Sequence, residues 1–443
     1  MKTPIHDFAK KYSEKNFLRL HMPGHKGKTF LGLEPYDLTE FDGADSLFSA
    51  NGIIHESELN AGTLFNADTF YSTEGSSLSI RAMLFLCCKL AKSQGKKPTI
   101  LAGRNAHKAF LSAISLIDLE VEWLYSNDSY ISCDITAKQI EEYFSNAKNL
   151  PFALYLTSPD YLGNTVDISS ISKVCKKYGV LLLVDNAHGA YLKFLPISLH
   201  PIDLGADICC DSAHKTLPAL TGASYLHINK NASPFFKDNA KEAMSLFAST
   251  SPSYLILQSL DLLNSYLDGN YKKKLLDVTK QVEHLKSALV SCGYTLIGNE
   301  PLKICIQTKP FGYYGYQFNE LLTQSDIMCE FYDKDFIVFM FSSETAKCDL
   351  LKLEKTLTDI PKKQSLLDSS PKNIKPQKAM SIREAFLSAS ETIAVKDADN
   401  KVLSSLIVNC PPAIPIVVSG ELIDNNVISA LTYYGINTCK VVK

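Results

Sequence analysis

Residues 180–188 read VLLLVDNAH, and residues 206–215 read ADICCDSAHK. In each stretch a short apolar run ends at a polar turn, which is the pattern of a buried strand. Asp185 directly follows the first run, and Lys215 lies just beyond the second, 30 residues further on. That spacing matches one strand–crossover–strand unit of about 30 residues. We therefore expect both side chains at the carboxyl edge of one parallel sheet, where open α/β sheets bind ligands.

The same alternation of apolar strands and amphipathic helices extends outward from these two stretches, from about residue 63 to 228. Short apolar strands that alternate with helices indicate an α/β fold with a mainly parallel sheet covered on both faces. The expected strands are 99–102, 121–125, 152–157, 180–184, 206–210 and 224–228, and the expected helices are 76–92, 137–147 and 168–178.

The remaining segments differ from this pattern. The first 60 residues are rich in Gly, Pro, His and Asp, which suggests an arm with a short opening helix. A helix-rich passage at 253–291 precedes strand patterns at 294–307 and 336–341, which indicate a second, smaller α/β unit. The segment 361–378 is polar and Lys-rich and contains several prolines, which is typical of a linker. The predicted bounds are 1–62 for the arm, 63–295 for the large domain, 296–360 and 379–443 for the two parts of the small domain, and 361–378 for the linker.

The composition is that of a folded protein. The 443 residues are 46% hydrophobic and 21% charged, with a net charge of −2, so neither a disordered chain nor a nucleic-acid partner is indicated. No apolar run reaches the ~20 residues that cross a bilayer, and the N-terminus has no apolar signal core. We expect a cytoplasmic protein with no membrane partner. The twelve cysteines show no C-x-x-C spacing, which favours reduced core thiols.

Two further segments carry groups that suit a phosphorylated aromatic ligand. Residues 73–77 read TEGSS and open an expected helix, so Gly75, Ser76 and Ser77 would offer backbone N–H groups and hydroxyls to a phosphate. His107 follows an expected strand, where its imidazole could lie flat on an aromatic ring.

Taken singly, these residues have ordinary interpretations. Lys215 alone is typical of a surface lysine, Asp185 of a turn cap, Ser76 of a helix N-cap and His107 of a loop histidine. Together, and in chain order on one sheet, they form a set with complementary chemistry. A phosphate cradle, a ring-stacking histidine, an aspartate for a ring nitrogen and a Schiff-base lysine specify pyridoxal 5′-phosphate.

A metal site is not expected. His21 and His25 are four residues apart, but Pro23 and Gly24 between them exclude the helix that would align two ligands. No third ligand is evident nearby. The glycines near Gly312 also lack the spacing of a dinucleotide or ATP site.

As a set, the motifs resemble the ornithine/lysine/arginine decarboxylase family, which has the aspartate-aminotransferase fold (fold type I). The similar stretches are LHMPGHKG at 20–27, DLTE at 37–40, DGAD at 42–45, GII at 52–54, RNAHK at 104–108, DNAHGA at 185–190, SAHKTLPALT at 212–221, TSPSY at 250–254, SIREAF at 381–386, PPAIP at 411–415 and GE at 420–421. The resemblance covers most of the chain. It implies a PLP-dependent transferase fold with an N-terminal arm and a smaller C-terminal domain, in a short form without the family's wing domain.

The resemblance also implies a role for each candidate residue. Lys215 would hold the cofactor as a Schiff base, Asp185 would pair with the pyridinium nitrogen, and His107 would stack on the ring. His188 would lie near the ring oxygen or the substrate, and it shares with Lys215 the role of candidate proton donor. Contacts to the cofactor phosphate would come from Gly75, Ser76, Ser77, Ser212 and His214.

By the same resemblance, the protein would decarboxylate arginine, lysine or ornithine to the corresponding amine and CO2, a reaction of polyamine biosynthesis. A homodimer is implied, since a neighbouring subunit commonly completes cofactor pockets of this fold. The sequence does not choose among the three substrates, although family analogy favours arginine slightly. Asp45 and Glu421 are candidate partners for the cationic tail of the substrate.

Two alternatives remain open at this point. One is another PLP-dependent enzyme, an aminotransferase or lyase, because cofactor-binding groups alone do not decide which bond breaks. The other is a poorly active decarboxylase-like protein that binds the cofactor. Departures from the family pattern motivate the second alternative. They are Glu74 in place of a small or amide residue, Asn186 in place of Glu, and Tyr191 and Phe48 in place of His.

Overall fold

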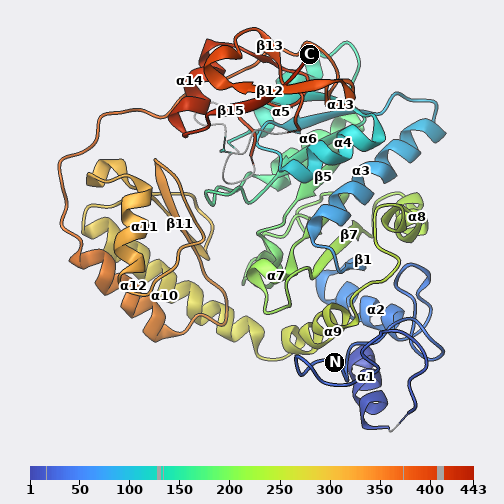
Figure 1. The fold of residues 1–443 in the computed structure, drawn as a ribbon. Coiled ribbons are helices and arrows are strands. Elements are labelled where there is room, and N and C mark those ends of the chain that lie inside the picture. Colours follow the sequence, from blue (N-terminus) through green and yellow to red (C-terminus); the bar gives the residue numbers. More distant parts are fainter. Residues whose placement is uncertain (16, 127–130, 133, 373, 407–413) are drawn as a thin grey trace. The chain divides into compact units, whose positions relative to one another are not determined.

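The computed structural model describes residues 1–15, 17–126, 131–132, 134–372, 374–406 and 414–443. The chain forms two compact units. The first contains Met1–Gly95 and Leu181–Leu275, and the second contains Lys96–Val180 and Leu276–Lys443. Each unit is therefore built from two stretches that lie far apart in the sequence (Figure 1).

The first unit contains four strands in the spatial order β1-β7-β6-β5. Strands β5 and β6 run parallel, whereas β7 is antiparallel to both β6 and β1. Helix α3 packs on β1, β6 and β7, and α2 packs on β1. The strand bounds are Ala67–Ser72 for β1, Leu181–Asp185 for β5, Ile208–Asp211 for β6 and Ser224–Asn229 for β7. The helices are α1 (Pro4–Glu14), α2 (Ile53–Phe65), α3 (Ser76–Ser93), α7 (Ala213–Thr216), α8 (Pro234–Ser245) and α9 (Tyr254–Asp268), with short 3-10 turns at Leu47–Ser49 and Ala190–Phe194.

The second unit contains the strands β4-β2-β3 in that order, all parallel. A separate antiparallel sheet has the order β10-β11-β9-β8. The strands are β2 (Thr99–Gly103), β3 (Glu120–Leu124), β4 (Ala153–Thr157), β8 (Thr295–Ile297), β9 (Lys303–Gln307), β10 (Phe331–Tyr332) and β11 (Phe336–Met340). Helix α10 (Tyr271–Ser291) starts in the first unit and continues in the second. The other helices are α4 (Lys108–Ile117), α5 (Ala137–Asn146), α6 (Ile168–Tyr178), α11 (Gly315–Thr323) and α12 (Lys347–Asp359), with a 3-10 turn at Lys309–Phe311.

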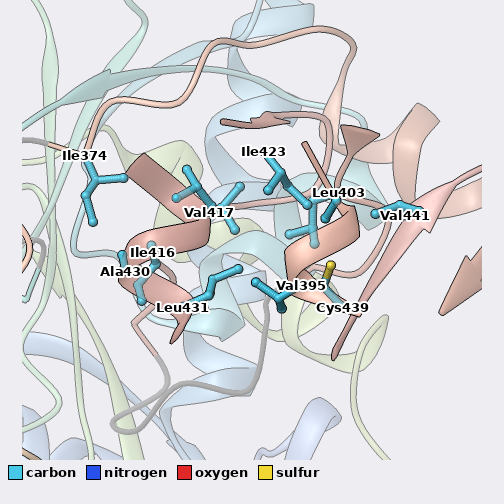
Figure 2. Close-up of a cluster of buried hydrophobic side chains, with 12 residues drawn as sticks. Ile374, Val395, Leu403, Ile416, Val417, Ile423, Ala430, Leu431, Cys439 and Val441 are labelled. Atoms are coloured by element: carbon cyan, nitrogen blue, oxygen red, sulfur yellow. The ribbon is translucent and has the colours of Figure 1, made fainter. Parts of the chain in front are cut away.

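The C-terminal part of the second unit has its own hydrophobic core, shown in Figure 2. Twelve buried side chains from Ile374 to Val441 form it, including Leu403, Val417 and Leu431. Antiparallel pairs β12–β15 and β13–β14 surround this core. The elements are α13 (Ile382–Leu387), β12 (Ser390–Ala394), a 3-10 turn (Val395–Asp397), β13 (Lys401–Val402), β14 (Leu422–Ile423), α14 (Asn425–Tyr433) and β15 (Thr438–Val442).

All six strands expected between residues 99 and 228 are present, with bounds shifted by two residues or fewer. Strand β1 was not expected, because its sequence ADTFYS carries polar residues at Asp68, Thr69 and Ser72. Thr69 and Ser72 are nevertheless buried, and β1 pairs with β7 along its whole length. A polar strand of this kind is stabilised by ladder and side-chain hydrogen bonds that a hydrophobicity pattern does not reveal.

Several other features of the described residues bear on the sequence analysis. Their ten cysteines are all free, and seven of them are buried, as expected for core thiols. None of their helices is long and apolar enough to cross a bilayer. Part of the PPAIP motif at 411–415 lies outside the described residues. The predicted domain bounds stay predictions.

Candidate active site

Asp185 is the last residue of β5 and is 1% exposed. Its Oδ1 atom accepts a hydrogen bond from the backbone N–H of Ala187 at 3.2 Å and contacts the Cys210 thiol at 3.6 Å. The register of the parallel pair β5–β6 places Asp185 opposite Cys210. The turns that follow these two strands therefore leave the sheet at the same edge, as the sequence predicts.

Lys215 lies in the short helix α7, which begins two residues after β6. Its Nζ atom is 3.1 Å from Nε2 of His188, a residue of the turn that follows β5. An ammonium group has only donors, so Nε2 is the acceptor in this contact. Two of the three predicted catalytic residues, Lys215 and His188, are therefore in direct contact. The third, Asp185, is the last residue of the strand that precedes His188.

The predicted phosphate cradle lies at the start of α3. Gly75 is the N-cap residue, with φ +69°, and it has no side chain that could cap the first-turn N–H groups. The Ser212 hydroxyl donates to Ser76 Oγ at 2.8 Å, which joins the turn after β6 to this helix start. A Cβ atom on Gly75 would lie 3.9 Å from Cε1 of His214. Gly75, Ser76, Ser212 and His214 therefore lie together, and Ser77 follows in the first turn of α3.

His214 is constrained in its protonation. Burial lowers its pKa, which favours the neutral ring. Its Nδ1 atom is 2.9 Å from the carbonyl oxygen of Ala223, so Nδ1 carries the proton. The neutral ring then has no N–H at Nε2. A contact from Nε2 to a phosphate oxygen would require His214 to take up a second proton.

Two departures from the family pattern have a structural explanation. The Glu74 carboxylate has a partner, since its Oε1 accepts a hydrogen bond from the backbone N–H of Ser249 at 2.7 Å. Asn186 donates from Nδ2 to Oδ1 of Asp211 at 2.7 Å. A glutamate at position 186 would bring a second carboxylate toward Asp211, whereas the amide supplies a donor.

Asp211 is the centre of a buried hydrogen-bond network that the sequence analysis did not identify. It is 0% exposed, and its Oδ2 atom lies 3.0 Å from Nε2 of His200 and 3.2 Å from Nε2 of His227. Burial raises the pKa of Asp211, but the two imidazoles more than offset this and leave the pKa lowered, so the carboxylate is ionised. Asp211 ends β6 just as Asp185 ends β5, and this shared position is the sequence signal that could have revealed it.

The same network contains donor atoms that a metal ion could use. His200, Cys209 and Asp211 each offer an atom, and these atoms lie within 4.8 Å of one another, all buried. However, His200 Nδ1 accepts from the backbone N–H of Ile202 at 3.4 Å, which places the ring proton on Nε2. A protonated nitrogen cannot bind a metal ion, and burial raises the pKa of the Cys209 thiol. We therefore interpret the group as a hydrogen-bond network.

His107 and Arg104 belong to the second unit. His107 is the N-cap residue of α4, and its Nδ1 atom accepts from the backbone N–H of Ala109 at 3.2 Å. If the ring is neutral, its proton is therefore on Nε2. Whether His107 stacks on a cofactor held by the first unit stays a prediction.

Both acidic residues suggested for the substrate tail already have partners within their own unit. Asp45 accepts hydrogen bonds from backbone N–H groups around the start of α2, including those of Gly52 at 2.8 Å and Ile54 at 3.1 Å. Glu421 forms a buried ion pair with Arg104 at 2.9 Å. Both carboxylates are thus engaged in stabilising their own segments.

Comparison with known proteins covers nearly the whole chain. The family model described as "Orn/Lys/Arg decarboxylase, major domain" matches residues 3–296, and the model of that family's C-terminal domain matches residues 362–438. An uncharacterized protein of Bacillus subtilis is 28% identical and covers 98% of this chain and 94% of its own length. An arginine decarboxylase of the same organism is 28% identical and covers 96% of this chain and 92% of its own length.

Solved structures show the fold. A lysine decarboxylase from Francisella novicida superposes with a TM-score of 0.79 at 17% identity, over 100% of this chain and 81% of its own. This likeness, together with the parallel strand pairs and flanking helices, shows the α/β architecture of PLP-dependent fold type I that the sequence predicts.

Proposed function

Because the chain belongs to the ornithine/lysine/arginine decarboxylase family, we propose that it removes the α-carboxyl group of a basic amino acid, with arginine as the first substrate to test. The observation that carries the proposal is the contact between Lys215 Nζ and His188 Nε2 at the sheet edge where Asp185 ends β5. Relatives similar to this chain over at least nine-tenths of its length carry the name arginine decarboxylase, which is why arginine comes first.

The residues at this edge fit pyridoxal 5′-phosphate. Asp185 offers a buried carboxylate for a cationic ring nitrogen, and Lys215 offers a primary amine for an aldehyde. The uncapped start of α3 at Gly75 and Ser76, beside Ser212, offers N–H groups and hydroxyls for a phosphate. When bound, the cofactor supplies an electron sink for the bond that breaks at Cα.

The chain's own residues then have distinct tasks. The Asp185 carboxylate, shielded from water, would hold a proton on the ring nitrogen. His188 would position the Lys215 amine through the 3.1 Å contact. Either Lys215 or His188 would return a proton to Cα after CO2 leaves. His107 would cover the ring face. The hydrogen bond from Ser249 to Glu74 would hold that carboxylate in place beside the predicted phosphate cradle.

The remaining parts of the proposal concern assembly, location and pathway. We propose a cytoplasmic homodimer in which the neighbouring subunit completes the pocket, acting in polyamine biosynthesis. Light scattering of the purified protein tests the dimer, and a monomer at working concentration would contradict it. Cell fractionation tests the location. Polyamine levels in cells that lack the gene test the pathway.

The reaction is tested by incubating the purified protein, supplied with the cofactor, with arginine, lysine and ornithine in turn. Released CO2 is trapped and the organic product is identified. The expected result is CO2 with the matching amine from at least one substrate. Production of a keto acid or ammonia would instead identify an aminotransferase or lyase.

Variants connect the activity to the proposed residues. Lys215→Ala is expected to abolish turnover and the cofactor's imine absorbance. Lys230→Ala is a matched control, because this exposed lysine contacts only Asn66 among the described side chains. Imine absorbance that survives in Lys215→Ala would refute the assignment of Lys215.

A further inference from the structure

The second unit contains a cavity of about 500 Å³ that the proposed reaction does not use. It lies between the end of α4 with β3 on one side and the C-terminal segments 378–382 and 418–421 on the other. Its size is within the range of about 300–1,000 Å³ that is usual for small-molecule sites. None of the residues predicted to bind the cofactor lines it.

Glu421 lines this cavity and is 3% exposed. Its Oε2 atom accepts from Arg104 NH2 at 2.9 Å and from the backbone N–H of Val418 at 2.8 Å. In the described part of the chain no group donates to Oε1. The Oε1 atom is not one of the fully buried side-chain atoms that lack a partner, so it reaches the surface of the cavity, where a carboxylate oxygen can accept a hydrogen bond from an incoming ligand.

The other walls suit an organic cation. Trp123 lines the cavity, and an indole face attracts cations. Asp118 adds a carboxylate at the exposed end of α4, and Lys97 is neutralised by Glu120 at 2.7 Å. The one other cation of the lining is Lys378, which is exposed. The Arg104 guanidinium lies 5.2 Å from the Trp123 ring centroid, so the Trp123 ring already contacts one organic cation in this structure.

Leu119, Val121, Met380, Ile382 and Val418 provide an apolar surface between these charged ends. A short alkyl chain would fit against it.

We propose that this cavity is a second, non-catalytic site for a small aliphatic amine. The ammonium or guanidinium head of the ligand would donate to Glu421 Oε1, and its alkyl chain would lie along Trp123 and Val121. An amine and the parent basic amino acid share this cationic head, but the α-carboxylate of the amino acid would meet the carboxylate of Asp118. We therefore expect the amine to bind more tightly. The inference rests on the cavity and does not depend on the proposed decarboxylation.

The experiment uses the fluorescence of Trp123, which is the only tryptophan in the chain. Full-length protein is titrated with agmatine and 1,4-diaminobutane, and in parallel with arginine and ornithine. Lys215→Ala protein is titrated alongside wild type to separate this site from the active site. The expected result is a saturable fluorescence change with either amine that is equal in wild type and Lys215→Ala.

Two variants localise the binding. Ala379 is an exposed residue of the lining, so Ala379→Phe fills the cavity while the backbone bond from Ala379 N to Gly420 O is kept. It is expected to abolish the fluorescence change. Glu421→Gln removes the negative charge and is expected to weaken binding about tenfold. Ala389→Phe is the matched control, since Ala389 is exposed and lies outside the lining.

The outcomes separate clearly. Saturable binding of an amine, alone or together with its amino acid, that Ala379→Phe removes and Ala389→Phe retains supports the site. Binding of the amino acids alone, no saturable change with any of the four compounds, or equal binding in wild type and Ala379→Phe overturns it. Failure of the CO2 assay would leave all of these outcomes unchanged, so the two proposals fail independently.

Discussion

Asp211 in the first unit and Glu421 in the second are buried carboxylates, 0% and 3% exposed, yet their pKa values are shifted in opposite directions. Burial raises the pKa of Glu421, and Arg104 offsets this only in part. Burial acts on Asp211 as well, but His200 and His227 outweigh it and lower the pKa. The difference lies in the partners, because two imidazoles face Asp211 whereas one guanidinium faces Glu421.

Asp211 receives side-chain donors at both oxygens, from Asn186 at Oδ1 and from the two histidines at Oδ2. Among the described residues, Glu421 receives donors from Arg104 and Val418, both at Oε2. Burial therefore does not by itself decide whether a carboxylate is ionised. The charges and hydrogen bonds of the groups that meet the carboxylate decide this together with burial.

The largest expected effect comes from removing the partner of Glu421. Arg104→Met leaves a buried carboxylate without its cation and is expected to lower the free energy of unfolding by about 3–5 kcal/mol at neutral pH. The pKa of Glu421 should rise further in the folded variant. Above pH 4.5 the folded variant then keeps a proton on Glu421 that the unfolded chain has released. The loss of stability relative to wild type should therefore grow between pH 5 and pH 8.

Denaturant unfolding at several pH values measures this effect. Arg383→Met is the matched control, because Arg383 donates to the carbonyls of Ser115 and Leu116 rather than to a carboxylate. Its deficit should not change with pH. A pH-independent deficit for Arg104→Met would show that Glu421 is not the group that Arg104 neutralises.

Asp211→Asn is expected to cost about 3 kcal/mol, because it removes a buried anion that accepts from three side chains. The native pKa of Asp211 lies below the unfolded value of 3.8, so its contribution is present above about pH 4 and is lost only as pH falls further. The titration of Asp211 itself therefore adds no pH dependence above about pH 5, and any change of the deficit between pH 5 and pH 8 reports the two histidines that face Asp211. Denaturant unfolding measures the deficit, and a loss below about 1 kcal/mol at pH 8 would contradict the paired state of Asp211.

Asn186→Asp tests the same network from the opposite side. It replaces the amide donor, 2.7 Å from Asp211 Oδ1, with a second acidic group, and about 2 kcal/mol of destabilisation is expected. Acidification should reduce this loss as the new carboxyl takes up a proton. Asn186→Ser, which removes the donor without adding charge, separates the two contributions. If Asn186→Asp were no less stable than Asn186→Ser, repulsion from Asp211 would be refuted.

The smallest effect is expected at the mouth of the cavity. The side chains of Lys97 and Glu120 form an ion pair but are 70% and 54% exposed. Because water and salt screen such a pair, Lys97→Ala should change the free energy of unfolding by less than about 0.5 kcal/mol. Thermal unfolding compared with wild type measures it. A larger loss would show that exposed pairs of this unit also contribute to its stability.

Sequence reasoning was most successful where one residue and its neighbours carry the signal. The strands that end at Asp185 and Asp211 could be predicted because apolar runs of that length and composition form buried strands. Strand β1 could not be predicted in this way, because its polar side chains are buried only when β7 pairs with it.

The candidate site shows the same contrast between signals that are local in the sequence and contacts that form only on folding. The residue types at positions 75, 76, 185, 188 and 215 suggested the cofactor, and the structure adds the contact between Lys215 and His188. The suggestion of Asp45 and Glu421 as partners for a substrate tail stays a prediction, and nothing local in the sequence shows that distant backbone N–H groups and Arg104 already contact those carboxylates.

The amino-acid sequence by itself determined the strand-and-helix pattern, the family and the residues that could carry the chemistry, because these depend on side-chain type and on short-range spacing along the chain. Only the tertiary structure decided the ionisation of Asp211 and Glu421 and the presence of a cavity beside Trp123. The physical reason is that ionisation and empty volume depend on which groups meet in space, and the groups that meet Glu421 include Arg104, 317 residues earlier in the chain.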